Sequence, residues 1–85
     1  MWWDDNFIAI NPRPLNEKDF HTILAFARNN MKVQATADEL GKRRDTVGYR
    51  IVRIKAITGL DPRNFYDLIK LVDMANSRLD GDVNA

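Results

Sequence analysis

The sequence contains no cysteine and a single histidine, His21, among its 85 residues. Without cysteine the chain has neither disulfides nor thiolate chemistry, as is usual in a reducing compartment. One imidazole with no nearby carboxylate pair does not assemble a metal site, so we place His21 at the surface. A Gly-rich phosphate loop and a paired nucleophile and base are also missing from the sequence. The sequence therefore argues against an enzyme and indicates no cofactor, no metal and no small-molecule ligand.

Long apolar runs are missing too, since none approaches the roughly 20 residues that span a bilayer. The first residues, MWWDDNF, lack the basic-then-apolar order of a signal peptide. We therefore expect a cytoplasmic protein that does not enter a membrane. With 45% apolar and 29% charged residues, the composition is that of a soluble globular domain with one modest core.

Hydrophobic spacing and capping residues predict a small all-α domain of four helices. The predicted helices run from 16 to about 29, and from about 33 to 40, 44 to 58 and 62 to 77. Asn16 and Asp61 are suitable N-caps, because their short side chains accept hydrogen bonds from the free amides of a first turn. Gly41 and Gly59 are suitable C-caps, because glycine adopts the left-handed conformation at low cost.

The second and third predicted helices have the spacing of a helix-turn-helix motif. Ala37 is small enough for the next helix to cross closely, and Gly41 ends the first helix four residues later. The second helix of the motif then places three aliphatic residues on one face, at helical spacing: Val47, Ile51 and Ile54. These residues are expected to form part of the core.

Charge is concentrated on this second motif helix. Six basic residues and one acid lie between Lys42 and Lys55, a net charge of +5, so the remainder of the chain sums to −4. A basic helix on an acidic body is typical of a module that lays one element against phosphates. The alternative is an ordinary solvated helix face.

A recognition helix contacts base edges chiefly through its N-terminal half. The candidates for contact with bases are therefore Arg43, Arg44, Asp45, Gly48 and Tyr49. The candidates for contact with phosphates are Lys42, Thr46, Arg50, Arg53 and Lys55. A helical wheel places Asp45, Tyr49, Val52 and Arg53 on the side that faces away from the core.

Three of these candidates have alternative explanations. Gly48 costs roughly 1 kcal/mol of helix stability relative to alanine, which suggests a close approach by either DNA or a neighbouring helix. Arg50 has an alternative role in an ion pair with Asp38 or Glu39. The alternative for Tyr49 is a half-buried core aromatic residue.

The remaining segments suggest contacts outside the motif. Residues 1–15 contain Trp2 and Trp3 and two prolines, and we expect an extended arm that wraps over the core or enters a second subunit. Residues 16–78 would be the helical domain and residues 79–85 a disordered tail. The apolar arc of the last helix is wider than one packing face needs, which supports a homodimer.

The run ATADELGKRRDTVGYRIVRIKAITGLD resembles the C-terminal helix-turn-helix domain of PucR-type regulators of purine catabolism and sugar-diacid metabolism. The matching residues are Thr36, Ala37, Leu40, Arg44, Thr46, Val47, Tyr49, Arg50, Ile51, Ile54, Thr58, Gly59 and Asp61. The likeness extends from Asn30 to Ala75, and a more distant one links the chain to Fis-type DNA-binding helices. The sequence departs from the family pattern at Lys42-Arg43 and at Asp45.

The resemblance implies a bacterial transcription regulator that places residues 44–58 in the major groove of double-stranded DNA. We expect a stand-alone, nucleoid-associated version of the domain without a sensory region. The competing hypothesis is a protein-interaction or adaptor module on the same scaffold, which would dock through the Trp-rich arm.

Overall fold

The computed structural model describes the backbone of residues 15–84 and the side chains of residues 15–79. Four helices make up this part of the chain. They are α2 (Glu17–Arg28), α3 (Val33–Leu40), α4 (Arg44–Thr58) and α5 (Phe65–Asn84). No strand occurs within residues 15–84, so the predicted all-α fold is confirmed. The expected extended arm, with Trp2 and Trp3, lies outside the described residues except for Leu15, which packs against the core.

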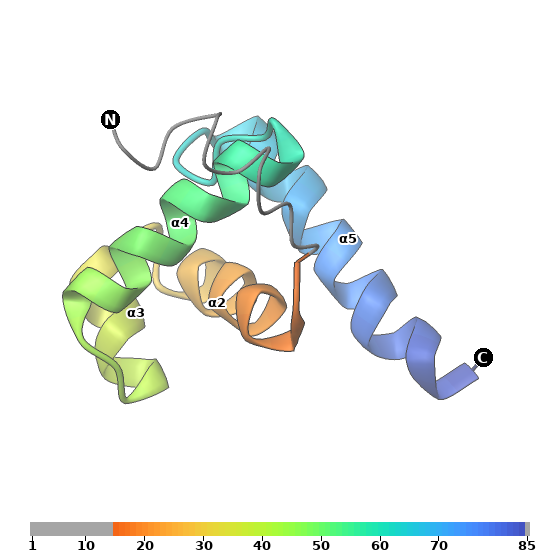
Figure 1. The fold of residues 1–85 in the computed structure, drawn as a ribbon, viewed down its shortest axis with the longest axis horizontal. Coiled ribbons are helices and arrows are strands. Elements are labelled where there is room, and N and C mark those ends of the chain that lie inside the picture. The colour runs from red at the N-terminus through yellow and green to blue at the C-terminus, as the bar shows by residue number, and fades with distance from the viewer. Residues whose placement is uncertain (1–14, 85) are drawn as a thin grey trace.

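Helix α2 lies at the centre of the arrangement and packs against each of the other three helices (Figure 1). Helices α3 and α4 also pack against each other, and α5 extends away from them beside α2. The predicted bounds of α3 and α4 agree with the observed ones. Because α2 is covered from several sides, it must be apolar around more than one face.

The core gathers side chains from all four helices. The buried apolar residues of its central cluster are Phe20, Ile23, Phe26, Ala37, Val47, Ile51, Ile54, Leu68, Leu71 and Ala75. The predicted stripe of α4 is therefore confirmed as core. In α2, Phe26 is fully buried, whereas Leu24 and Ala27 are only partly buried. The central position of α2 therefore buries residues on more than one of its faces.

The start of α2 is fixed by a capping box, which confirms Asn16 as the N-cap. The side chain of Asn16 accepts a hydrogen bond from the amide of Asp19 at 3.0 Å, and the carboxylate of Asp19 accepts one from the amide of Asn16 at 3.0 Å. His21, in the next turn, is exposed as expected. The same Asp19 carboxylate has a second partner in α4, as described below.

The connection from α2 to α3 contains two non-glycine residues in the left-handed region, Asn30 with φ 55° and Met31 with φ 62°. Met31 is partly buried against the core, which offsets the cost of this conformation. An ion pair between Arg28 and Glu39 joins the end of α2 to α3. Its hydrogen bond lowers the pKa of Glu39 and raises the pKa of Arg28.

The turn between α3 and α4 is closed as predicted. Gly41 is left-handed, with φ 65°, and the amide of Lys42 donates to the carbonyl of Ala37 at 2.9 Å. Gly59 ends α4 in the same way, with φ 76°. The hydroxyl of Thr58 donates to the carbonyl of Ile54 at 2.7 Å, which satisfies another carbonyl of the last turn.

The start of α5 differs from the prediction. Asp61 is not its N-cap, because the helix begins at Phe65 after a turn that includes Pro62. The side chain of Asn64 accepts from the amide of Asp67 at 3.1 Å and takes the capping role. The carboxylate of Asp67 accepts from the amide of Asp61 at 3.1 Å, which holds the turn.

The end of α5 also differs from the prediction. The helix continues to Asn84 and therefore includes most of the segment 79–85 for which we expected a disordered tail.

Alanine substitutions at Gly41 and Gly48 separate backbone strain from crowding, because an added Cβ at either position meets no atom within 4 Å. Gly41→Ala places a side chain at φ 65° and should destabilise the fold by about 1 kcal/mol. Gly48→Ala lies within a helix and should stabilise the fold by roughly 0.5 to 1 kcal/mol. Urea denaturation of both variants measures the difference, and effects of the same sign would contradict the description of these two glycines.

Candidate nucleic-acid interface

Helix α4 presents opposite faces to the core and to solvent. Val47, Ile51 and Ile54 are buried, whereas Asp45, Tyr49 and Val52 are exposed. Tyr49 is 51% exposed and does not belong to the core cluster, so it is not the half-buried core aromatic that was the alternative. The predicted orientation of the helix is therefore confirmed for these residues.

The N-terminal tip of α4 is cationic and accessible. Lys42, Arg43 and Arg44 are exposed, and among the described residues none of the three has an ion pair or a side-chain hydrogen bond. Arg43 is the N-cap residue and does not cap through its side chain, so amides of the first turn also remain available. Three cations therefore lie at the N-terminus of α4, where the helix dipole is positive and an anion is favoured.

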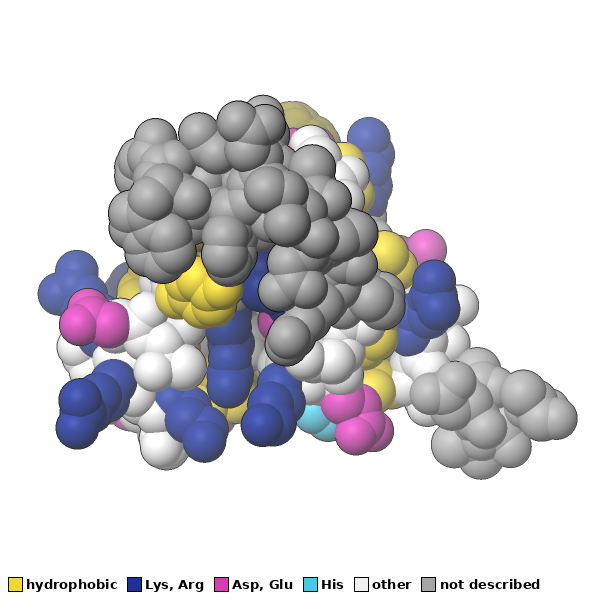
Figure 2. Space-filling view, in the orientation of Figure 1, with side chains coloured by type: hydrophobic (Ala, Val, Ile, Leu, Met, Phe, Trp, Pro, Cys, Tyr) yellow, Lys and Arg dark blue, Asp and Glu magenta, His cyan; other side chains and the backbone are white. Residues whose placement is uncertain are grey.

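Four of the five residues predicted to contact bases surround one groove on the outer side of α4. The groove is lined by Arg44, Asp45, Gly48 and Tyr49, together with Val33, Val52 and Arg63. Arg43, the fifth candidate, is exposed at the tip of the helix but does not line the groove. On the face shown in Figure 2, Lys and Arg side chains gather over the α3–α4 part of the molecule, with an apolar patch between them.

Two residues of this groove were missed because they come from other elements. Val33 is the first residue of α3, and Arg63 belongs to the turn before α5. A helical wheel of α4 cannot place either of them.

Gly48 lies in the groove with free space above it. A Cβ atom built there meets no heavy atom within 4 Å, so no neighbouring helix of the described chain approaches it closely. One of the two explanations considered for this glycine, a close helix–helix contact, is therefore removed for the described residues. The space remains open to a molecule that approaches α4 from outside.

The residues predicted to contact phosphates divide into two groups. Lys42 and Lys55 are exposed, and Lys55 makes a solvent-exposed ion pair with Asp61 at 3.7 Å. Thr46 is partly buried in the first turn of α4. Exposed ion pairs of this kind contribute little to stability, so Lys55 remains available to a phosphate.

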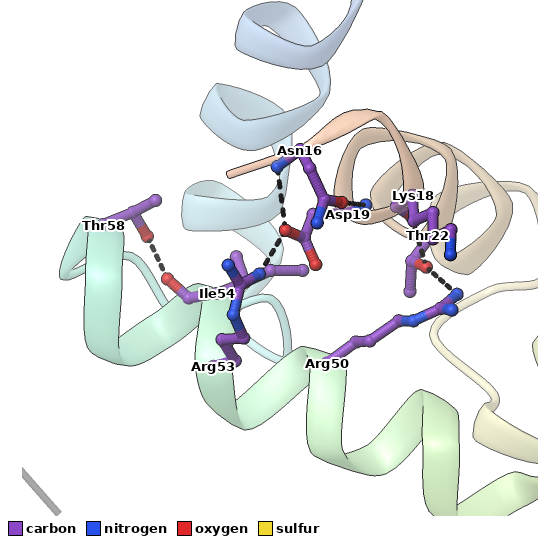
Figure 3. Close-up of polar contacts among 8 residues, drawn as sticks. All are labelled: Asn16, Lys18, Asp19, Thr22, Arg50, Arg53, Ile54 and Thr58. Carbon is purple, nitrogen blue, oxygen red and sulfur yellow. Dashed lines mark hydrogen bonds and ion pairs between the residues drawn. The ribbon is translucent and has the colours of Figure 1, made fainter. Parts of the chain in front are cut away.

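Arg50 and Arg53 form the second group, and both side chains point toward α2 rather than toward solvent (Figure 3). Arg50 donates to the hydroxyl of Thr22 at 3.2 Å and pairs with neither of the acids that were its alternative partners. Arg53 forms an ion pair with Asp19. The expectation that Arg53 faces away from the core is therefore wrong, because α2 covers the flank of α4 that the wheel treated as open.

These four side chains, Asp19, Thr22, Arg50 and Arg53, form what we call the α2–α4 clasp. The side chain of Asp19 is 3% exposed and that of Arg53 is 14% exposed, so their ion pair is shielded from water. The hydroxyl of Thr22 also donates to the carbonyl of Lys18 at 2.8 Å, which orients its oxygen toward Arg50. The clasp thus holds α4 at one angle across α2.

No helix in the described residues has the length and apolar character needed to cross a membrane. In the same part of the chain, His, Asp and Glu side chains form no cluster able to hold a metal ion.

The crossing of α3 and α4 over the turn at Gly41, with an exposed second helix, defines a helix-turn-helix protein. The model of the family described as the PucR C-terminal helix-turn-helix domain matches residues 20–72, which is more than half of the chain. The chain belongs to this family. Membership confirms the resemblance noted from the sequence, and it supports a DNA-binding regulator rather than an enzyme.

Among curated proteins, the chain is similar to the transcriptional activator PmfR of Paenarthrobacter nicotinovorans. The two are 45% identical over 47 residues, which are 55% of this chain and 10% of that protein. The chain therefore corresponds to a small part of the relative that it matches. Comparison with solved structures gave no significant match.

Substitution of Arg53 tests the role of the clasp in the fold. Arg53→Met removes one partner of a shielded ion pair and leaves the Asp19 carboxylate without its counter-charge, so we expect a loss of about 2 kcal/mol or more. Lys55→Met is the matched control, because its pair with Asp61 is exposed and should contribute less than about 0.5 kcal/mol. Chemical denaturation of both variants measures this, and equally small losses would show that the clasp does not hold α4.

Proposed function

We propose that this chain binds double-stranded DNA as a sequence-specific transcription regulator, with α4 in the major groove. One observation carries the proposal: the exposed tip and outer side of α4 bring together three cations that have no ion-pair partner among the described residues and a groove lined by four of the base-contact candidates. The aliphatic side of the same helix is buried, so no rotation of α4 exchanges these two surfaces without opening the core. Membership of the PucR C-terminal helix-turn-helix family supports the same function.

The exposed residues of α4 take different roles in this proposal. Arg43 and Arg44 are suited to guanine, because a guanidinium donates bidentately to O6 and N7. Asp45 is suited to the N4 amino group of cytosine. Gly48 and Tyr49 lie one turn further along, where base edges pass the helix.

The phosphate contacts are assigned to exposed cations. Lys42, at the start of the turn into α4, and Lys55, near the end of α4, are both exposed and would contact the DNA backbone on either side of the major groove. Thr46 adds a hydroxyl in the first turn. Arg50 and Arg53 act instead through the clasp, where they set the angle of α4 and thereby position the other residues.

A second copy of the chain would supply the second half-site. Phe65 is 58% exposed and Ile69 is 51% exposed on α5. These two residues line an apolar groove with Met31, Leu68 and Val72 among its other residues. We propose that this surface pairs two copies and places two recognition helices about 34 Å apart, one turn of DNA.

DNA binding is tested by fluorescence anisotropy with random duplex DNA. We expect the affinity to fall about tenfold to a hundredfold between about 50 and 200 mM salt, because phosphate contacts release counterions. No binding at low salt would favour the adaptor module instead. As a protein of the nucleoid, the chain would act in the cytoplasm.

The role of Arg44 is tested by charge reversal. Arg44→Glu should lower the affinity for a selected duplex by about tenfold or more, since it removes a base contact and adds a charge that phosphate repels. Lys70→Glu makes the same change on the exposed surface of α5 and serves as the control. If both variants lose affinity equally, net charge rather than the tip of α4 determines binding.

The proposed pairing surface is tested by light scattering at micromolar concentration. We expect the mass of a dimer for the unaltered chain and of a monomer for Ile69→Glu, because the substitution places a charge in an apolar interface. Circular dichroism should show the same helix content for both proteins. A monomer mass for the unaltered chain would rule out the dimer.

A further inference from the structure

The groove beside α4 is largely apolar although it lies on a surface proposed to contact DNA. It is lined by Gly48, Tyr49 and the two valines Val33 and Val52, together with three charged residues, Arg44, Asp45 and Arg63. Val52 is 39% exposed and Tyr49 is 51% exposed, on the side of α4 opposite the core stripe. The outer side of this helix therefore combines cations with apolar carbon.

Exposure of these apolar side chains to water costs free energy, and the fold does not require apolar residues at these positions. A β-branched residue such as Val52 is a poorer helix former than lysine or glutamate, which an exposed position would tolerate equally well. Gly48 lowers helix stability further, although no neighbouring atom requires its lack of a Cβ. Both residues become favourable when an apolar group fills the groove.

The edges of DNA bases offer one such group in the major groove. Adenine, guanine and cytosine present nitrogen and oxygen donors and acceptors there, whereas thymine adds a C5-methyl group. A methyl group buried against valine and tyrosine gains the free energy of apolar burial, and a polar base edge at the same place gains none. The groove therefore discriminates by the presence of a methyl group.

We propose that the groove formed by Val33, Gly48, Tyr49 and Val52 recognises the C5-methyl of a thymine in each half-site. This inference rests on the DNA-binding function proposed above and names one base of its target. Gly48 lets the base edge approach the backbone of α4, and the two valines close over the methyl group from α3 and α4.

The charged residues that line the groove would extend the contact to the base pairs and phosphate next to the thymine. Arg44 and Asp45, one turn before Gly48, face the adjacent base pairs. Arg63 enters from the turn before α5 and is exposed, so it is placed to contact the phosphate that follows the thymine. The apolar residues of the groove thus suit a thymine methyl group, and its charged residues suit the neighbouring base edges and phosphate.

The experiment replaces thymine by deoxyuridine, which removes only the C5-methyl and keeps base pairing. A bound duplex is first selected from a random pool, and each thymine of its half-site is then replaced in turn. One replacement should weaken binding by about fourfold, the value expected for one buried methyl group. The full chain is used throughout, with anisotropy as the readout.

Variants locate the methyl contact within the groove. Val52→Ala should reduce the difference between the thymine and deoxyuridine duplexes to less than about twofold, because one of the two valines that close over the methyl group is shortened. Ile57→Val shortens an aliphatic side chain of α4 that lines neither this groove nor the apolar groove of α5, and it should retain the difference. Melting curves for both variants confirm that each is folded at the temperature of the titration.

The outcomes separate this inference from the function on which it rests. Failure to bind any duplex at low salt would overturn DNA binding, and the methyl contact with it. Selective binding without a thymine in the half-site, or with no effect of deoxyuridine, would overturn the methyl contact alone. If deoxyuridine weakens binding of Val52→Ala as much as it weakens binding of the unaltered chain, the methyl contact lies outside this groove and the inference is overturned.

Discussion

Burial of the aliphatic stripe of α4 determines which side chains of that helix reach solvent. Val47, Ile51 and Ile54 are buried in the core cluster, and each contributes about 1.5 to 3 kcal/mol through removal from water. The ion pair of the clasp contributes less in net terms, because desolvation of both charges offsets much of their attraction. The stripe therefore supplies most of the stability of the α4 position, while the clasp selects the angle at which α4 crosses α2.

The clasp also changes the charge that α4 offers to a partner. The sequence places six basic residues between Lys42 and Lys55, but Arg50 and Arg53 are engaged with α2. The cations left at the surface are concentrated at the N-terminal tip, where the helix dipole adds to them. Positive charge is thus gathered at one end of the helix rather than spread along it, and the outer side can carry the apolar residues of the groove.

Much of the fold could be predicted because its determinants are local. The bounds of α3 and α4 follow from periodic aliphatic residues and from glycines that take the left-handed conformation, and Asn16 caps α2 through a residue three positions away. The start of α5 could not be decided in this way. Asp61 and Asn64 are both suitable caps, and the choice depends on Asp67, whose carboxylate holds the amide of Asp61.

The candidate site was predicted less completely than the fold, because it depends on how the helices pack. The exposed positions of Asp45, Tyr49 and Val52 follow from the helical wheel of α4 alone. The position of Arg53 does not, since it requires knowing that Asp19 lies across from it. Likewise, Val33 and Arg63 join the groove only through the tertiary structure.

The central claim is that the outer side of α4 contacts DNA. An NMR titration of the ¹⁵N-labelled chain with duplex DNA tests this claim most directly. The largest changes should fall on the amides of Arg44, Asp45, Gly48 and Tyr49, with small changes for buried residues such as Phe26. Changes centred instead on Phe65 and Ile69, with α4 unaffected, would contradict the account and assign contact with DNA to another face.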